Sequence, residues 1–185
     1  MQVGLILAAG SGSRMGSPKA IVEINGQRLV DRAVANFHAA GISEVYVVLG
    51  AWVGEVPGAQ ILINKEWAEG MGSSLRVGLS AIQARPEVDA VVVSLVDLPG
   101  MTPAALAAVA SSPAELAIGS YGGKSGHPVK FSRNHWQGIV DSAIGDQGAR
   151  GYLKGRDDIE MISLDLLATD GDVDTPEDLL SFESQ

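Results

Sequence analysis

An apolar run near the start of the chain, followed directly by a glycine-rich loop, constrains the fold more than any other feature. Residues 3–9 carry no polar side chain and lead straight into Gly10. Such a run is typical of a strand buried on both faces of a parallel sheet. Glycines at positions 10, 12 and 16 then allow backbone turns with positive φ. The sequence therefore predicts a central strand that feeds a tight loop.

Strand-like and helix-like segments alternate along the rest of the chain. Further strands are predicted at residues 44–49, 59–63, 88–95, 115–120 and 159–164. Helical periodicity begins at Gln27 and ends near Gly41, and other helices are predicted to begin at Ser73, Pro103, Trp136 and Pro176. This alternation predicts one α/β domain over residues 1–185, a three-layer α/β/α arrangement around a mainly parallel sheet. Ligands of such sheets bind beyond the carboxyl ends of the strands.

Composition excludes several kinds of site and protein. The chain has no cysteine, so disulfides, zinc–thiolate sites and a cysteine nucleophile are excluded. No apolar stretch is long enough to span a bilayer, and the first residues lack the basic segment of a signal peptide. We therefore expect a cytoplasmic protein that does not associate with a membrane.

The net charge of −9 is unevenly distributed along the chain. Residues 157–185 hold ten of the 22 acidic residues and none of the 13 lysines and arginines. Residues 1–22 instead contain Arg14 and Lys19 and no acid. A small anion can bind such a locally positive loop, whereas a nucleic acid would find no continuous basic stripe. We expect small-molecule partners and no nucleic acid.

The loop at residues 7–19 has the composition of a phosphate-binding site. Its glycine N–H groups and the cations of Arg14 and Lys19 can surround an anion together. It fits neither the dinucleotide-binding G-x-G-x-x-G pattern nor the Walker loop, because the third glycine comes one residue late and Lys19 follows Pro18. A flexible turn with two solvated cations is the alternative interpretation.

This loop, L-A-A-G-S-G-S-R-M-G-S-P-K, resembles the signature of the MobA-like nucleotidyltransferases, in particular the molybdenum cofactor cytidylyltransferases. Later segments resemble other blocks of that family in order: residues 70–79, 96–99, 126–129, 145–150 and 172–179. The resemblance implies a Rossmann-like nucleotidyltransferase fold. It implies transfer of a nucleoside monophosphate from an NTP to the terminal phosphate of molybdopterin, with release of pyrophosphate. Guanylyl-transferring relatives more often carry glycine at the position of Ala9, which favours CTP.

The same resemblance assigns roles to individual residues. Arg14, Lys19 and Asp97 would be catalytic, and Asp97 and Asp174 would hold Mg²⁺. The residues expected to bind the nucleotide are Leu7, Ala8, Ala9, Gly10, Ser11, Gly12, Arg14, Lys19, Asn64, Ser73 and Ser74. His127, Asp146 and Arg150 would bind the second substrate. The resemblance also implies transient contact with molybdoenzyme maturation proteins.

Simpler explanations remain open for four of these residues. Asp97 ends a predicted buried strand, where an unpaired carboxylate is costly, so either a metal ion or a helix cap would explain it. Asp174 could belong to a solvated acidic turn at residues 170–174. Ser73 could cap a helix, and His127 could fill a turn in a glycine-rich hairpin.

Nucleotidyl transfer to a phosphate needs no protein nucleophile, because a phosphate monoester is mostly dianionic at neutral pH. The reaction needs alignment of the reacting groups and positive charge, which Mg²⁺, Arg14 and Lys19 would supply. Two other enzymes are compatible with the same fold: a cytidylyltransferase for a sugar or polyol phosphate, and a flavin- or nicotinamide-dependent oxidoreductase. A nucleotide-binding regulator without transfer activity is a further alternative.

Overall fold

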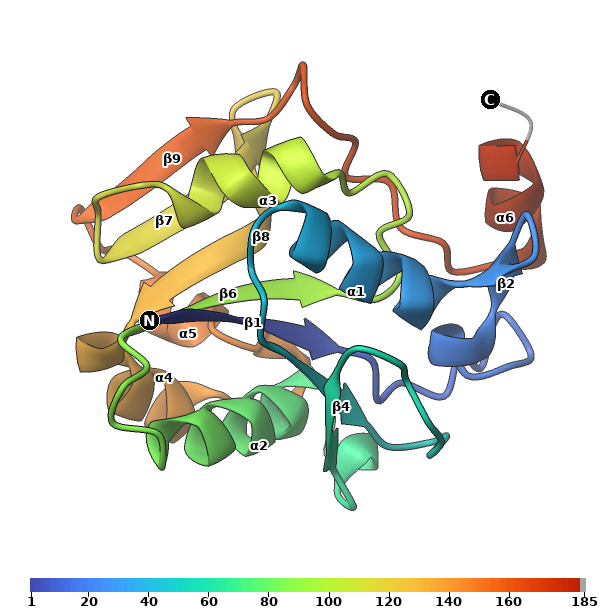
Figure 1. The fold of residues 1–185 in the computed structure, drawn as a ribbon, viewed down its shortest axis with the longest axis horizontal. Helices are drawn as coiled ribbons and strands as arrows, with labels where there is room; N and C mark the ends of the chain where they lie inside the picture. The colour runs from blue at the N-terminus through green and yellow to red at the C-terminus, as the bar shows by residue number, and fades with distance from the viewer. Residues whose placement is uncertain (184–185) are drawn as a thin grey trace.

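A computed structural model describes residues 1–183 and shows a seven-stranded sheet with helices on both faces (Figure 1). The strands are β1 (Gln2–Leu7), β4 (Val45–Leu49), β5 (Gln60–Ile63), β6 (Ala90–Leu95), β7 (Leu116–Tyr121), β8 (Lys124–Ser132) and β9 (Ile159–Ser163). They lie in the order β5-β4-β1-β6-β8-β7-β9. A separate ribbon pairs β2 (Glu23–Ile24) with β3 (Gln27–Arg28).

Six α-helices and four short 3-10 helices connect the strands within the described residues. The α-helices are α1 (Leu29–Ala39), α2 (Met71–Gln83), α3 (Pro103–Ala110), α4 (Trp136–Ser142), α5 (Arg150–Leu153) and α6 (Pro176–Glu183). The 3-10 helices are η1 (Lys19–Ile21), η2 (Trp67–Glu69), η3 (Arg133–His135) and η4 (Gly145–Gln147). No helix in residues 1–183 combines the length and the apolar character needed to cross a membrane.

The prediction of a mainly parallel sheet in a three-layer fold is confirmed. Strands β5, β4, β1 and β6 run parallel, and β7 pairs in parallel with β9. Only β8 is antiparallel to its neighbours, β6 and β7. The carboxyl ends of β1 and β6 therefore lie side by side, since Leu7 is in register with Leu95.

Two apolar clusters fill the space between the sheet and its helices. On one face, α1 and α3 pack through fully buried residues such as Phe37 and Leu106. On the other face, α2 and α4 contribute Leu79 and Trp136. Burial of each such side chain stabilises the fold by about 1.5–3 kcal/mol. Gly4 in β1 leaves room for the Phe37 ring, because a Cβ there would lie 2.5 Å from it.

The helix predicted from Gln27 begins two residues later, at Leu29. Gln27 instead pairs with Ile24 in the β2–β3 ribbon. Asn25 and Gly26, with φ of 52° and 75°, form the turn between the two strands. Asn-Gly is the sequence favoured by such tight hairpin turns, because both residues must adopt positive φ. The local turn preference therefore overrides the helical periodicity at this point.

Strand β8 is missing from the sequence prediction, and the alternative that His127 fills a turn is wrong. The turn of the β7–β8 hairpin is formed by Gly122 and Gly123, and His127 lies inside β8. Pro128 follows it, where the pairing with β7 shifts register next to Gly119. A proline cannot donate a ladder hydrogen bond and is tolerated at such an irregularity. Because Gly126 and Pro128 are typical of loops, the sequence did not predict this strand.

Candidate functional site

A cleft of about 670 Å³ opens at the carboxyl ends of β1 and β6. The loop after β1, the start of α2 and the segment before α6 form its walls. The structure brings eleven of the predicted site residues to this cleft: Leu7, Ala9, Gly10, Ser11, Arg14, Lys19, Ser74, Asp97, Asp146, Arg150 and Asp174. Its position matches the place where open α/β sheets bind ligands.

Gly12 shapes the loop that carries the two cations. Its φ of 59° is in the left-handed region, and a Cβ there would lie 2.0 Å from the carbonyl oxygen of Ser17. Gly16 closes the bend by donating its N–H to the Gly12 carbonyl at 2.9 Å. The chain then enters η1, whose first residue is Lys19. Only glycine fits at position 12, and the tight bend returns Lys19 to the cleft.

Lys19 and Arg14 form ion pairs with two of the predicted site carboxylates. The Lys19 ammonium donates to Oδ2 of Asp97 at 2.5 Å and to Oδ1 of Asp174. Arg14 donates to Oδ2 of Asp174 at 2.5 Å. Burial lowers the pKa of Lys19, but Asp97 and Asp174 outweigh it and raise the pKa above the ordinary value. The hydrogen bond from Lys19, helped by Arg14, lowers the pKa of Asp174.

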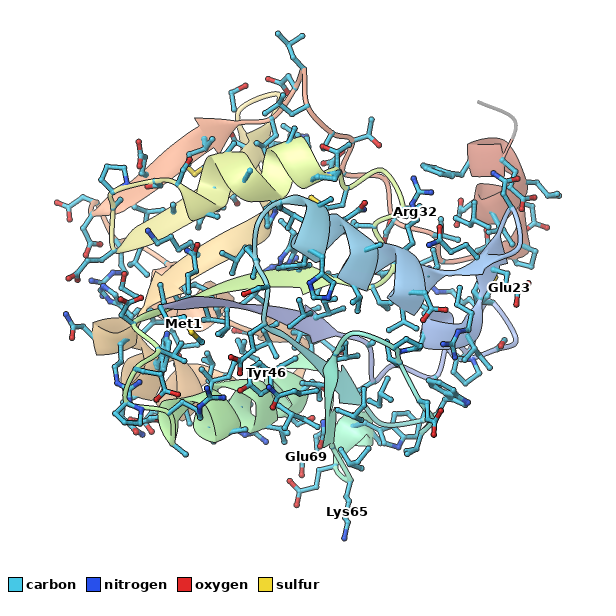
Figure 2. The ribbon with its side chains drawn as sticks, in the orientation of Figure 1. Met1, Glu23, Arg32, Tyr46, Lys65 and Glu69 are labelled. Carbon is cyan, nitrogen blue, oxygen red and sulfur yellow. The ribbon has the colours of Figure 1, made fainter. Side chains whose placement is uncertain are left out.

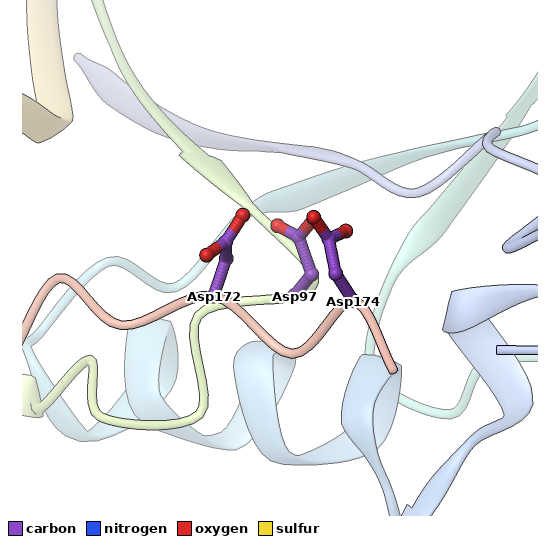
Figure 3. Close-up of side chains that lie close together, drawn as sticks. All are labelled: Asp97, Asp172 and Asp174. Atoms are coloured by element: carbon purple, nitrogen blue, oxygen red, sulfur yellow. The ribbon is translucent and has the colours of Figure 1, made fainter. Parts of the chain in front are cut away.

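Backbone contacts bring the acidic segment at residues 172–174 beside the end of β6. Val173 donates its N–H to the Asp97 carbonyl at 2.9 Å, and Asp174 donates its N–H to the side chain of Asp178 at 3.1 Å. As a result Asp97, Asp172 and Asp174 each offer a carboxylate oxygen within 4.8 Å of the others (Figure 3). Sequence reasoning did not assign Asp172 a role. The spacing of two between Asp172 and Asp174 was the available signal, since such residues share a side of an extended chain.

The carboxylate cluster fits a hard divalent cation. Oδ1 of Asp97 is buried and accepts no hydrogen bond from any residue in 1–183. A buried carboxylate oxygen without a partner is costly, and a cation removes that cost. Mg²⁺ and Mn²⁺ prefer carboxylate oxygens as ligands. The alternative that Asp97 caps a helix is wrong, because Thr102 caps α3 by accepting the Ala105 N–H at 3.2 Å.

Asn64 and Ser73 lie behind the cleft wall rather than on it. The Asn64 side chain is 2% exposed and donates to the hydroxyls of Ser73 at 2.7 Å and Ser74 at 3.0 Å. Helix α2 begins at Met71 with Gly70 at its N-cap, so Ser73 does not cap it as the alternative supposed. Of these three polar residues only Ser74 lines the cleft. Nucleotide binding by Asn64 and Ser73, and by Ala8 and Gly12 in the loop, stays a prediction.

A second, smaller cavity of about 140 Å³ adjoins the cleft. Its walls are mainly apolar, and Arg150 lines both spaces. His127 also lines the small cavity, and burial lowers the pKa of its imidazole, with Arg150 lowering it further. Within residues 1–183 Arg150 forms no ion pair. The cavity therefore combines an apolar interior with an unpaired cation at its mouth.

Asp146, in η4, places its side chain beside the start of α2. Its Oδ1 accepts the N–H of Met71 at 3.4 Å and lies 2.5 Å from where a Cβ on Gly70 would be. The carboxylate is thus part of the cleft wall and lies at the N-terminal end of α2, which favours negative charge. Trp67 and Met71 complete this wall. Met71 lies in the segment at residues 70–79 that resembles a family block, whereas no motif in the sequence distinguished Trp67.

A family model for the MobA-like NTP transferase domain matches residues 4–160. The chain belongs to this family. The MobA-like match spans the glycine loop, Lys19 and Asp97, and it stops before Asp172 and Asp174. Membership of this nucleotidyltransferase family agrees with the resemblance of the loop sequence and with the position of the cleft.

Among its MobA-like relatives is the nicotine blue oxidoreductase of Paenarthrobacter nicotinovorans, 31% identical, with 95% of this chain and 93% of that protein covered. A nucleotidyl transferase from Methanothermobacter thermautotroptrophicus has the same fold, with a TM-score of 0.81 at 19% identity over 100% of this chain and 96% of that one. Rv0371C of Mycobacterium tuberculosis H37Rv, solved in complex with manganese, gives a TM-score of 0.75 at 23% identity. The match covers 100% of this chain and 98% of that one. The nucleotidyltransferase fold predicted from the sequence is therefore confirmed.

Proposed function

We propose that this MobA-like transferase joins the nucleoside monophosphate of an NTP, with CTP preferred, to the terminal phosphate of molybdopterin. The reaction uses Mg²⁺ and releases pyrophosphate. One observation carries the proposal: a glycine loop with two cations and a cluster of three carboxylates meet in one cleft. The first feature suits a triphosphate, and the second suits the divalent ion that accompanies it.

On the donor side, the loop at residues 10–12 and the cations of Arg14 and Lys19 would surround the triphosphate. Asp97 and Asp174 would hold Mg²⁺, which when bound neutralises phosphate charge. That the solved relative Rv0371C binds manganese supports a divalent ion in this fold. The start of α2 and Ser74 face the same cleft, where the nucleoside would lie. Ala9 lines the cleft, and guanylyl-transferring relatives more often carry glycine at this position, which supports CTP as the preferred donor.

On the acceptor side, Arg150 has the position and charge to bind a phosphate. It lines the cleft and the smaller cavity, so a phosphate beside it would be next to the donor while the rest of the acceptor enters the cavity. His127 lies in the same cavity wall, and its lowered pKa leaves it neutral at pH 7. A neutral imidazole does not attract the acceptor's charge, so Arg150 would orient the phosphate.

The transfer needs only alignment and charge from the protein. An oxygen of the acceptor phosphate attacks the α-phosphorus of the donor, the bond from that phosphorus to the bridging oxygen breaks, and pyrophosphate leaves. Arg14 and Lys19 would stabilise the negative charge that develops on the transferred and departing phosphates. The attacking oxygen is already deprotonated at neutral pH, so no side chain has to remove a proton. The product would pass to molybdoenzyme maturation proteins in the cytoplasm through transient contacts.

A nicotinamide-dependent oxidoreductase is the second candidate. The specific observation that favours it is the relative named nicotine blue oxidoreductase, which is 31% identical over most of both chains. A dinucleotide pyrophosphate could use the same glycine loop and the same cations. Hydride transfer does not require a carboxylate cluster, however, and the unpartnered Oδ1 of Asp97 favours the metal-dependent transferase.

Pyrophosphate release distinguishes the candidates. The protein is incubated with each of the four NTPs, with molybdopterin, a sugar phosphate, a polyol phosphate or no acceptor, and with Mg²⁺ or a chelator. We expect release with CTP and molybdopterin only when Mg²⁺ is present. Consumption of a reduced nicotinamide dinucleotide without pyrophosphate release would instead establish the oxidoreductase. Absence of both activities, with nucleotide still bound, would point to a regulator.

A further inference from the structure

We propose that a divalent cation enters the carboxylate cluster by displacing the ammonium group of Lys19, and that Asp172 is the third carboxylate that then holds it. The inference rests on the proposed metal-dependent function and goes beyond it. It states that the protein's own lysine competes with the metal, so that removal of a positive residue of the active site strengthens metal binding.

Both oxygens of Asp174 are already used by cations of the protein. Oδ1 accepts a hydrogen bond from Lys19, and Oδ2 accepts one from Arg14 at 2.5 Å. A metal ion that bridges Oδ1 of Asp174 and Oδ2 of Asp97 would compete with Lys19, which contacts both of these oxygens. Lys19 also contacts Oδ2 of Asp97 at 2.5 Å, so its ammonium lies between two of the three carboxylates. It occupies the space that a bridging cation needs.

Electrostatic repulsion requires that the ammonium leave. A divalent ion and an ammonium within a few ångströms of each other repel more strongly than two monovalent cations, and this repulsion is only partly screened at a half-buried site. The three carboxylates carry a charge of −3 and Lys19 with Arg14 carries +2, which leaves −1. Replacement of the ammonium by a divalent ion changes this sum to 0. The exchange therefore neutralises the cluster and releases a cation.

Asp172 is the carboxylate that no cation of the protein uses. It is exposed, it lines the cleft, and its side chain forms no hydrogen bond or ion pair with residues 1–183. Figure 3 shows its carboxylate beside those of Asp97 and Asp174. It contributes nothing to binding Lys19, but with a divalent ion present it supplies the third negative ligand. Asp172 should therefore affect metal affinity without affecting the resting ion pairs.

The exchange also explains how Lys19 can bind the carboxylates when the metal ion is absent and the triphosphate when it is present. Lys19 lines the cleft, so an ammonium released from the carboxylates stays next to the glycine loop. A triphosphate would accept it there, and this makes release of Lys19 less costly. Metal and nucleotide should consequently strengthen each other's binding by the same factor, because such coupling is reciprocal. Without Lys19 the part of this coupling that comes from the exchange is lost.

The test measures Mn²⁺ binding by electron paramagnetic resonance without nucleotide, which does not depend on turnover. We expect Lys19→Met to bind Mn²⁺ at least about tenfold more tightly than the wild type, as the loss of a nearby cation predicts. Lys65→Met is the matched control, because Lys65 is exposed and points away from the molecule (Figure 2). It should leave Mn²⁺ affinity unchanged. Arg14→Met tests the other cation. If Mn²⁺ binds more tightly to Arg14→Met but not to Lys19→Met, the proposed exchange of Lys19 for the metal ion is wrong.

Asp172→Asn tests the third ligand. We expect about tenfold weaker Mn²⁺ binding with an unchanged thermal unfolding temperature, because Asp172 has no partner in the resting cluster. Asp170→Asn is its control, two residues earlier, exposed and outside the cluster. Equal Mn²⁺ affinity in Asp172→Asn and the wild type would remove Asp172 from the metal site.

The outcomes separate this inference from the proposed function. If Asp97→Asn abolishes Mn²⁺ binding while Lys19→Met leaves it unchanged or weakens it, the metal site stands and the exchange is wrong. If Asp97→Asn has no effect on Mn²⁺ binding, the metal-dependent function itself is wrong. Circular dichroism of each variant checks that the fold is retained, and the conservative Lys19→Arg variant should keep the Mn²⁺ affinity of the wild type.

Discussion

The Lys19 ammonium lies 2.5 Å from Oδ2 of Asp97, although the two residues are 78 positions apart in the chain. The sheet brings them together. Strands β1 and β6 are parallel neighbours, with Leu7 opposite Leu95, and each is followed by a loop that carries one of the two residues. The pair marks the point where the phosphate-binding loop meets the carboxylate cluster.

Lys19→Met should lower the rate of pyrophosphate release by about 10²–10³, the usual cost of removing one group that stabilises transition-state charge. The measurement is kcat with CTP, molybdopterin and saturating Mg²⁺, with Lys65→Met as the control. The fold should persist, since Mg²⁺ can neutralise the carboxylates that Lys19 leaves. A turnover rate within roughly threefold of the wild type, the scatter expected of near-neutral variants, would exclude a catalytic role for Lys19.

Gly12→Ala should impair nucleotide binding far more than Gly16→Ala. Both glycines have positive φ, but only at position 12 would the new Cβ meet another atom, the Ser17 carbonyl oxygen at 2.0 Å. The shared left-handed strain costs about 1–2 kcal/mol in each variant, so the difference reports the clash alone. Calorimetric titration with CTP in the presence of Mg²⁺ measures it. Equal affinities would show that the bend at Gly12 does not shape the nucleotide site.

Asn64→Ala should destabilise the protein by about 1–3 kcal/mol, the cost of leaving buried hydrogen-bonding groups without partners. Asn64 is 2% exposed and bonds Ser73 and Ser74. Urea unfolding measures the loss, with the exposed Asn134→Ala as the control. If stability is unchanged but CTP binding is lost, Asn64 contacts the nucleotide directly and does not support the wall behind it.

Acidification from pH 7 to pH 5 should destabilise the wild type more than His127→Gln. Burial lowers the pKa of His127 below its ordinary value of 6.5. The unfolded chain therefore takes up a proton at this residue at a higher pH than the folded protein does, and stability falls as the pH drops below 6.5. Chemical unfolding at both pH values measures the difference. His38→Gln is the control for the loss of a histidine, because His38 is exposed and lies outside the small cavity.

Much of the fold could be predicted from the sequence, because its main elements have strong local signals. The run at residues 3–9 predicted β1, and Pro103 correctly marked the start of α3. Strand β8 could not be predicted in the same way. Gly126 and Pro128 are typical of loops, and its place between β6 and β7 makes it a strand.

The chemical core of the site was predictable for a different reason. Lys19 and Asp97 stand in motifs whose residue types already suit phosphate and metal. The role of Asp172 depends on where the backbone of Val173 attaches beside Asp97, a contact between segments 76 residues apart that no local pattern contains. Asn64 was assigned to the nucleotide, and only the packing of α2 shows that it bonds Ser73 and Ser74 behind the wall.

Anomalous diffraction from crystals grown with Mn²⁺ and a non-hydrolysable CTP analogue tests the central claim most directly. The claim is that the glycine loop binds the triphosphate while carboxylates hold the divalent ion opposite. We expect a manganese peak between Asp97 and Asp174, the triphosphate against residues 10–12, and the Lys19 ammonium on a phosphate oxygen. A peak elsewhere, with Lys19 still paired to Asp97 and the analogue bound outside the cleft, would contradict it.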